Sequence, residues 1–222
     1  MLAGQVYSGE ARVEKAGQLL ACAAPLTVRD GGLRYVSRGG LKLEAALDHF
    51  GLDVAGLEAL DLGASTGGFT DCLLQRGAAS VVAVDVGFGQ LHPRLRGDPR
   101  VLVRERLNAR GLTREHVERD VDLLVGDVSF ISLRLVLPPA LRFLKPGGAL
   151  LVLVKPQFEV GRADVGKGGV VRDASKRREA IEGIAAFAAG LGLLVQGWMD
   201  SPVAGPAGNV EALLFARKPP AP

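Results

Sequence analysis

Four charged residues, two lysines and two carboxylates, stand where predicted helices or strands begin or end. Lys42 lies at the start of the first helical stretch, and Glu211 opens the last apolar strand. Asp127 and Lys155 each follow directly on an apolar strand, a placement that is by itself typical of a chain leaving the core for solvent. Because the carboxyl ends of parallel strands meet at one edge of a sheet, we expect the four to form a near-neutral cluster. In such a cluster a neutral lysine accepts a proton and a charged lysine stabilises an oxyanion.

A glycine-rich loop follows the first strong strand and leads into a helix; it reads DLGASTGGF over residues 61–69. Glycines there let a ligand approach the backbone closely, and Asp85, which ends the second strand, is placed to accept hydrogen bonds from a ribose diol. The loop lacks the dinucleotide fingerprint G-x-G-x-x-G, and Asp61 would repel a pyrophosphate. The same carboxylate favours the sulfonium and amino groups of S-adenosylmethionine. We therefore predict this cofactor; a glycine turn without a ligand and a nucleotide-dependent oxidoreductase are the alternatives.

The elements that must position these residues alternate between short apolar runs and helical stretches. This pattern predicts an α/β fold with a parallel sheet covered on both faces. A short connection without a helix, residues 200–209, precedes the last run, so the final strand is expected to run antiparallel. The predicted strands are 57–62, 81–84, 101–103, 123–125, 149–154, 193–195 and 212–215, and the predicted helices are 41–50, 68–76, 113–119, 133–144 and 174–191.

Charge and composition limit the function classes. The formal net charge is only +3, but residues 90–119 hold eight arginines and residues 162–178 hold six cations, a clustering typical of contacts to a phosphate backbone or of a solvated helix face. No apolar run approaches the roughly 20 residues of a membrane-spanning helix, which excludes an integral pore, and no secretory signal is visible. Two cysteines, Cys22 and Cys72, suit a reducing cytoplasm. The three histidines share no metal-ligand spacing, so we expect no metal site.

The first part of the chain has a different character. Residues 1–33 are rich in turns and alternate weakly, as two or three short strands without a covering helix would. Such a segment is too small to form its own core and must lean on another part. Residues 34–40 (RYVSRGG) are expected to be a linker.

Seven stretches of the sequence resemble the TlyA, or hemolysin A-like, family of ribosomal RNA 2′-O-methyltransferases, whose fold and active site are similar to the FtsJ/RrmJ type. The resemblance implies a Rossmann-like class I S-adenosylmethionine-dependent methyltransferase domain over residues 41–218, a tail at 219–222, and a partial S4-like RNA-binding segment at 1–33. The stretches are 35–43 (YVSRGGLKL), 61–74 (DLGASTGGFTDCLL), 83–91 (AVDVGFGQL), 126–132 (GDVSFIS), 154–159 (VKPQFE), 166–173 (GKGGVVRD) and 201–211 (SPVAGPAGNVE).

The resemblance also implies roles for individual residues. The catalytic set is Lys42, Asp127, Lys155 and Glu211, of which we expect Lys155 to contact the reacting hydroxyl. The cofactor-binding set is Asp61, Gly63, Ala64, Ser65, Thr66, Gly67, Gly68, Phe69, Asp85, Val86, Asn108 and Asp127. The basic stretches supply Arg38, Arg94, Arg96, Lys167, Arg172 and Arg177 as RNA-binding candidates, and Phe88, Phe130 or Phe158 is placed to stack one flipped base or to pack in the core.

The implied substrate is a cytidine of ribosomal RNA, within ribosomal subunits in the cytoplasm. Two further readings stay open at this point. One is an RNA-binding module without catalysis, against which the four intact charged positions argue. The other is the membrane-lytic protein that the hemolysin label suggests, for which no strongly amphipathic apolar helix is evident.

Overall fold

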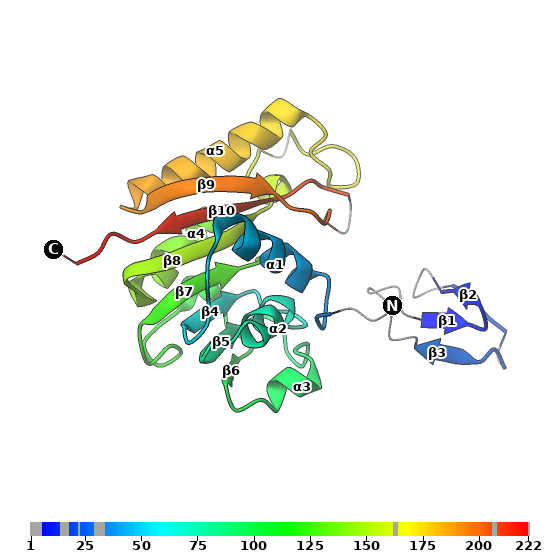
Figure 1. Ribbon diagram of the computed structural model, residues 1–222. Helices are drawn as coiled ribbons and strands as arrows, with labels where there is room; N and C mark the ends of the chain where they lie inside the picture. Colours follow the sequence, from blue (N-terminus) through cyan, green and yellow to red (C-terminus); the bar gives the residue numbers. More distant parts are fainter. Residues whose placement is uncertain are drawn as a thin grey trace.

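The computed structural model describes residues 6–13, 18–21, 23–28, 34–161, 164–205 and 208–221. Cys22 and Arg162, both considered above, lie outside the described residues. Near the N-terminus, β1 (Val6–Ser8) pairs antiparallel with β2 (Ala11–Arg12) on one side and with β3 (Leu26–Val28) on the other. These are the short strands that the weak alternation predicts, and Figure 1 shows them beside the larger body that carries the remaining elements.

A seven-stranded sheet forms the larger body, in the order β6-β5-β4-β7-β8-β10-β9 (Figure 1). The parallel strands are β4 (Glu58–Leu62), β5 (Ser80–Val84), β6 (Val101–Arg104), β7 (Val121–Gly126) and β8 (Leu144–Val154). The last strand, β10 (Ala212–Arg217), runs antiparallel between β8 and β9 (Leu194–Asp200). The predicted parallel sheet with an antiparallel last strand is therefore confirmed.

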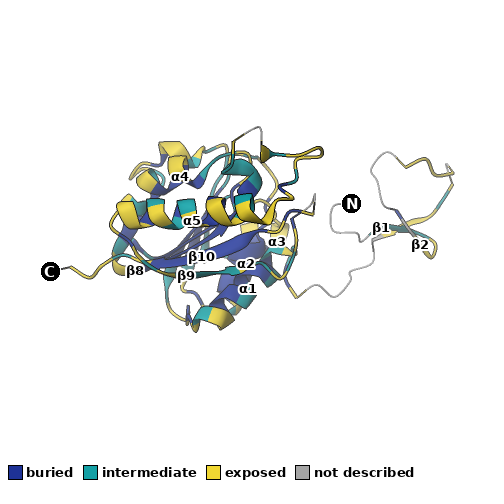
Figure 2. Ribbon diagram, turned by 90° about the horizontal axis from the view of Figure 1, so that it is seen from above, coloured by how far each residue is buried: buried dark blue, intermediate teal, exposed yellow. Residues whose placement is uncertain are grey.

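Helices cover both faces of this sheet, as Figure 2 shows by its dark inner strands and the exposed outer sides of the helices. Alternation along β8 explains the two layers, because successive side chains of a strand point to opposite faces. Leu151 and Leu153 belong to the core under α1 (Gly39–Phe50) and α2 (Gly68–Gln75). Leu150, Val152 and Val154 belong to the core under α4 (Leu133–Ala140) and α5 (Ala174–Gly190).

Two helix ends show why these segments form helices where they do. At the C-terminus of α1, Gly51 adopts a φ of +61° and its N–H bonds back to the carbonyls of Leu47 and Asp48, which stops the helix. At the N-terminus of α5, the Asp173 carboxylate accepts hydrogen bonds from the backbone N–H groups of Ser175 and Lys176.

The connection between β6 and β7 corrects one prediction. The helix expected at 113–119 does not form: a 3-10 turn, Ala109–Gly111, is followed by a turn in which His116 and Val117 both donate to the carbonyl of Thr113. Only Val117 of that segment is buried, so there is no apolar stripe to stabilise a helix against the sheet.

Further segments also differ from expectation. The helix predicted at 133–144 ends at Ala140 and continues as a 3-10 turn, Leu141–Phe143, so that β8 begins five positions before residue 149. A short helix, α3 (Pro93–Arg96), was not predicted. The stretch expected to be a linker is packed at its start, because Tyr35 is 2% exposed and the N–H of Val36 donates to Asp71 at 2.8 Å.

Candidate active site

The first of two lysine–carboxylate pairs joins α1 to the start of β10. Lys42 is on the first turn of α1, and Glu211 immediately precedes β10, whose pairing with β8 fixes its position in the sheet. The Nζ of Lys42 lies 2.5 Å from Oε2 of Glu211, and the two side chains are 8% and 0% exposed. A pair this close and this buried is held together because either charge alone would be left without water or a partner.

The second pair joins the ends of two neighbouring parallel strands. Asp127 follows β7 and Lys155 follows β8, so the strand pairing brings them side by side. The Nζ of Lys155 lies 2.6 Å from Oδ1 of Asp127, and it also donates to the hydroxyl of Ser129 at 2.6 Å. This pair is more open than the first, since the Asp127 side chain is 23% exposed.

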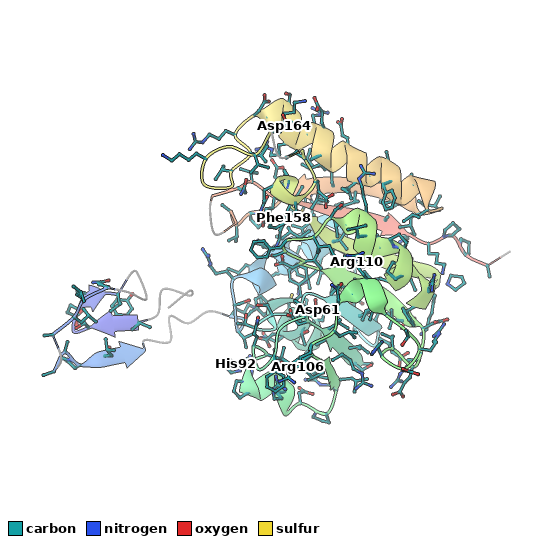
Figure 3. All side chains as sticks on the ribbon, turned by 180° about the vertical axis from the view of Figure 1, so that it is seen from behind. Asp61, His92, Arg106, Arg110, Phe158 and Asp164 are labelled. Carbon is teal, nitrogen blue, oxygen red and sulfur yellow. The ribbon has the colours of Figure 1, made fainter. Side chains whose placement is uncertain are left out.

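All four charged residues line one cavity of about 930 Å³. The structure thus brings together the side chains that the sequence placed at the carboxyl edge of the sheet, two as cations and two as anions. The lining of this cavity also includes Phe130 and Phe158, whose ring centroids are 5.2 Å apart. Figure 3 labels Phe158, which belongs to the short 3-10 turn Pro156–Phe158 after β8.

The glycine-rich loop forms the adjoining wall and leaves no room for side chains at several positions, two of which also have a positive φ. Gly63 has a φ of +77°, and a Cβ there would lie 2.8 Å from the carbonyl oxygen of Asp127. Gly67, with a φ of +99°, would carry its Cβ 2.2 Å from Leu95. Both positions therefore require glycine, and Gly63 lines both cavities without a side chain.

A second cavity of about 800 Å³ continues from the first along the end of β5. Asp85, Val86 and Asn108 line it, all three of them predicted to bind the cofactor. Asp85 accepts hydrogen bonds from the N–H groups of Ser65 at 2.8 Å and Gly87 at 2.7 Å, which fixes its carboxylate at the rim. The residues that line both cavities, and so join them into one trough, are Gly63, Ser65, Asp127, Ser129, Phe130 and Phe158.

Asp61 does not reach this trough. It is fully buried beneath the loop, where Oδ2 accepts the Thr70 hydroxyl at 2.7 Å and Oδ1 has no hydrogen-bond partner. Burial, together with the nearby Asp127 and Asp85 charges, raises the pKa of Asp61 to about 7. Gly67 also lies outside the lining of the two cavities, whereas the predicted Ala64, Thr66, Gly68 and Phe69 line the first.

The RNA-binding candidates fall into two groups. Arg94, Arg96 and Arg177 form ion pairs with Asp71, Glu105 and Asp200. Arg38, Lys167 and Arg172 are exposed and have no ion-pair partner among the described residues, and Arg38 lies at the rim of the first cavity.

Two aromatic side chains are also left outside the core. Phe130 is 91% exposed with a φ of +62°, and Phe88 is 66% exposed with the Arg106 guanidinium 4.1 Å from its ring centroid. Figure 3 labels Arg106, the residue whose guanidinium lies over Phe88. Neither exposed ring packs as a buried core residue.

Sequence reasoning did not single out Ser129, Gln157 or Asn209, all of which line the first cavity. Ser129 holds Lys155, and Asn209 is a buried polar residue with both ends of its amide bonded. The one clue that the sequence offered for these residues is that each lies two positions from a predicted site residue: Asp127, Lys155 or Glu211. In the part of the chain that the structure describes, His, Cys, Asp and Glu side chains do not gather in threes as a metal site would need, and none of the helices is both long and apolar enough to cross a membrane.

Comparisons with known proteins agree with this geometry. The family model for FtsJ-like methyltransferases matches residues 35–218. The chain is 47% identical over 220 residues to YqxC of Bacillus subtilis, described as a candidate rRNA methyltransferase, covering 99% of this chain and 78% of that protein. It is 50% identical over 216 residues to the 16S/23S rRNA (cytidine-2′-O)-methyltransferase TlyA of Mycobacterium tuberculosis, covering 97% and 81%. A solved structure described as a candidate hemolysin from Streptococcus thermophilus superposes with a TM-score of 0.85 at 44% identity, over 100% of this chain and 81% of that one.

Proposed function

The chain belongs to the FtsJ-like methyltransferase family, and from this we propose that it transfers a methyl group from S-adenosylmethionine to the 2′-hydroxyl of a cytidine in ribosomal RNA. The observation that carries the proposal is the pair of lysine–carboxylate contacts around one cavity, joined by a trough to the glycine-rich loop. Because the family is one of methyltransferases, methyl transfer is favoured over the nucleotide-dependent oxidoreductase activity that the fold alone would allow.

The residues of the trough fit the cofactor. The uncovered backbone at Gly63 permits close approach, and the fixed carboxylate of Asp85 suits the two hydroxyls of a ribose. Asn108 and Val86 would hold the adenine side, while Asp127 and Phe69 would hold the methionine side. When bound, S-adenosylmethionine supplies an electrophilic methyl group next to a positive sulfonium.

Lys155 is the residue we assign to the reacting oxygen. A ribose hydroxyl is a poor nucleophile until its proton is removed and it is aligned with the methyl group. The two contacts at 2.6 Å, to Asp127 and Ser129, hold the Lys155 amine at the cavity wall. There the amine takes up the hydroxyl proton, or as an ammonium stabilises the oxygen while negative charge develops on it. Lys42 lines the same wall and adds positive potential, and Glu211 holds it in place.

The RNA would approach over the exposed cations around the cavity. Arg38, Lys167 and Arg172 are free to contact phosphates, whereas Arg94 and Arg96 would first have to leave their carboxylate partners. We place the substrate within ribosomal subunits, and an rRNA substrate locates the reaction in the cytoplasm. The N-terminal strands are proposed to be part of an S4-like segment that adds a further RNA contact.

The test is transfer of tritium from labelled S-adenosylmethionine to isolated ribosomal subunits, with the modified nucleotide mapped. Lys155→Ala should abolish transfer while cofactor binding, measured by calorimetry, survives. Lys145→Ala is the matched control, because Lys145 lies at the opposite end of the same strand and pairs with Asp122 at 2.8 Å. Near-normal turnover by Lys155→Ala, or label in a position other than a ribose 2′-oxygen, would overturn the proposal.

A further inference from the structure

Asn209 is a buried polar residue that none of the steps above uses. It is 2% exposed, yet its side chain does not bond to the strand it precedes. Its Oδ1 accepts the N–H of Val171 at 3.0 Å, and its Nδ2 donates to the carbonyl of Gly169 at 2.9 Å. Both the oxygen and the nitrogen of the amide thus bond to one loop that is distant along the chain. A buried side chain bonded this way fixes the backbone it contacts.

The loop that Asn209 holds is a tight hairpin, residues 166–170. Gly166 and Val170 form a β-bridge, and the N–H of Gly169 donates to the carbonyl of Gly166 at 3.0 Å. Gly168 and Gly169 have φ values of +83° and +77°, so the turn depends on glycine at both positions. Both glycines line the first cavity, and Lys167 at the tip is exposed with no ion-pair partner among the described residues.

Asn209 also belongs to the wall beside the buried pair. Its carbonyl accepts the N–H of Gly205 at 2.9 Å. Gly205 in turn lies against Glu211, because a Cβ on it would be 2.6 Å from Oε1 of that carboxylate. One residue therefore connects the hairpin at the mouth of the cavity to the Lys42–Glu211 pair at its wall.

From these contacts we propose that Asn209 is a positioning residue for the RNA substrate. It locks the 166–170 hairpin over the cavity so that Lys167 meets a phosphate next to the methylated nucleotide. This rests on the proposed function, since it assumes that the cavity receives an RNA strand. Without the two bonds the hairpin would still exist, but Lys167 would be spread over many positions and its phosphate contact would be lost.

The experiment measures binding of an rRNA fragment between about 50 and 200 mM salt, because each phosphate contact contributes roughly 0.7–0.9 to the slope of log K against log salt. Lys167→Ala should reduce the slope by about one contact. Asn209→Ala should reduce it equally, and the double variant should reduce it no further. Binding of S-adenosylmethionine should remain in Lys167→Ala, because Lys167 lines neither cavity. Lys145→Ala is the matched lysine control and should keep the full slope.

A second variant guards against a simple folding defect in Asn209→Ala. A Cβ at Gly168 meets no atom within 4 Å, so Gly168→Ala strains only the turn and leaves the buried side of the loop intact. It should lower RNA affinity and the salt slope as Asn209→Ala does, with an unchanged melting temperature of the main transition.

The inference fails if any one of Asn209→Ala, Gly168→Ala and Lys167→Ala keeps the wild-type slope. Failure of the proposed function would be seen separately, as a wild-type protein that transfers no methyl group to rRNA whatever its salt slope.

Discussion

Breaking the Lys42–Glu211 pair from one side should destabilise the protein far more than removing both charges. At the observed 2.5 Å, and with an effective dielectric constant of about 20, the attraction is about 7 kcal/mol, which offsets a desolvation cost of several kcal/mol for each ion. Glu211→Gln leaves Lys42 as an unpaired buried charge. We therefore expect a loss of about 3–5 kcal/mol in the free energy of unfolding, a large part of the 5–15 kcal/mol of a typical domain.

The double variant Lys42→Met, Glu211→Gln should recover most of that loss, because both replacements are close in size and neither carries a charge. Urea unfolding followed by circular dichroism gives the four free energies of the cycle, with a coupling expected to exceed about 2 kcal/mol. The exposed pair Arg178–Glu182, at 2.7 Å with side chains 69% and 54% exposed, is the control and should couple by only about 0.3–0.5 kcal/mol. If the losses in the free energy of unfolding of the two single variants simply added up to that of the double variant, this account of how the pair is held would be refuted. All of these variants at the buried pair should lack methyl transfer, including the double variant that folds well.

Three further predictions concern the glycine-rich loop, the buried Asp61 beneath it and the exposed Phe130. Burial raises the pKa of Asp61 to about 7 from about 4 in the unfolded chain, so the folded state holds this proton more tightly. The contribution of Asp61 to the free energy of unfolding therefore falls as pH rises from about 4 to 7. Asp61→Asn should remove that fall, as judged by urea unfolding at pH 5 and pH 8. Gly63→Ala adds about 1–2 kcal/mol of backbone strain and places a Cβ 2.8 Å from the carbonyl oxygen of Asp127, so it should weaken cofactor binding in calorimetry. Gly56→Ala is the control, because Gly56 has a φ of +74° and no atom near its Cβ. It should add the backbone strain alone and bind the cofactor normally. Phe130→Ala should raise the KM for RNA by roughly 5- to 150-fold, the equivalent of about 1–3 kcal/mol for one stacked base. An unaltered KM would mean that the ring stacks on no base.

The sequence predicted the sheet and the place of the charged residues well because both depend on local patterns. Apolar runs of strand length separated by helices leave few topologies, and in each of them the residues that follow β7 and β8 share one edge. Which lysine pairs with which carboxylate was not predictable. That choice is made by the packing of α1 against the start of β10, and the sequence contains no local signal for it.

The errors have an equally physical origin. Residues 113–119 have polar residues at helical spacing but bury only Val117, so a single core contact was available to stabilise the expected helix. Tyr35 and Val36 looked like a linker because of the glycines that follow, yet one is buried and the other is bonded to Asp71 on α2. The contacts of Asn209 were not predictable either, since its two hydrogen-bond partners lie on a loop that comes 38–40 residues earlier.

The two ion pairs are unequal, and the inequality divides the work between them. The Glu211 side chain lies at the cavity wall but is 0% exposed, so we propose that it acts through Lys42, whereas Asp127 is 23% exposed and lines both cavities. Lys155 alone of the two lysines has a hydroxyl partner, Ser129, in addition to its carboxylate. Under the proposed function, the more open pair therefore suits the reacting oxygen, and the closed pair would keep a positive charge fixed beside it. A preorganised charge of this kind needs no rearrangement when an oxyanion develops, so a fully buried carboxylate contributes to the site by holding the lysine in place.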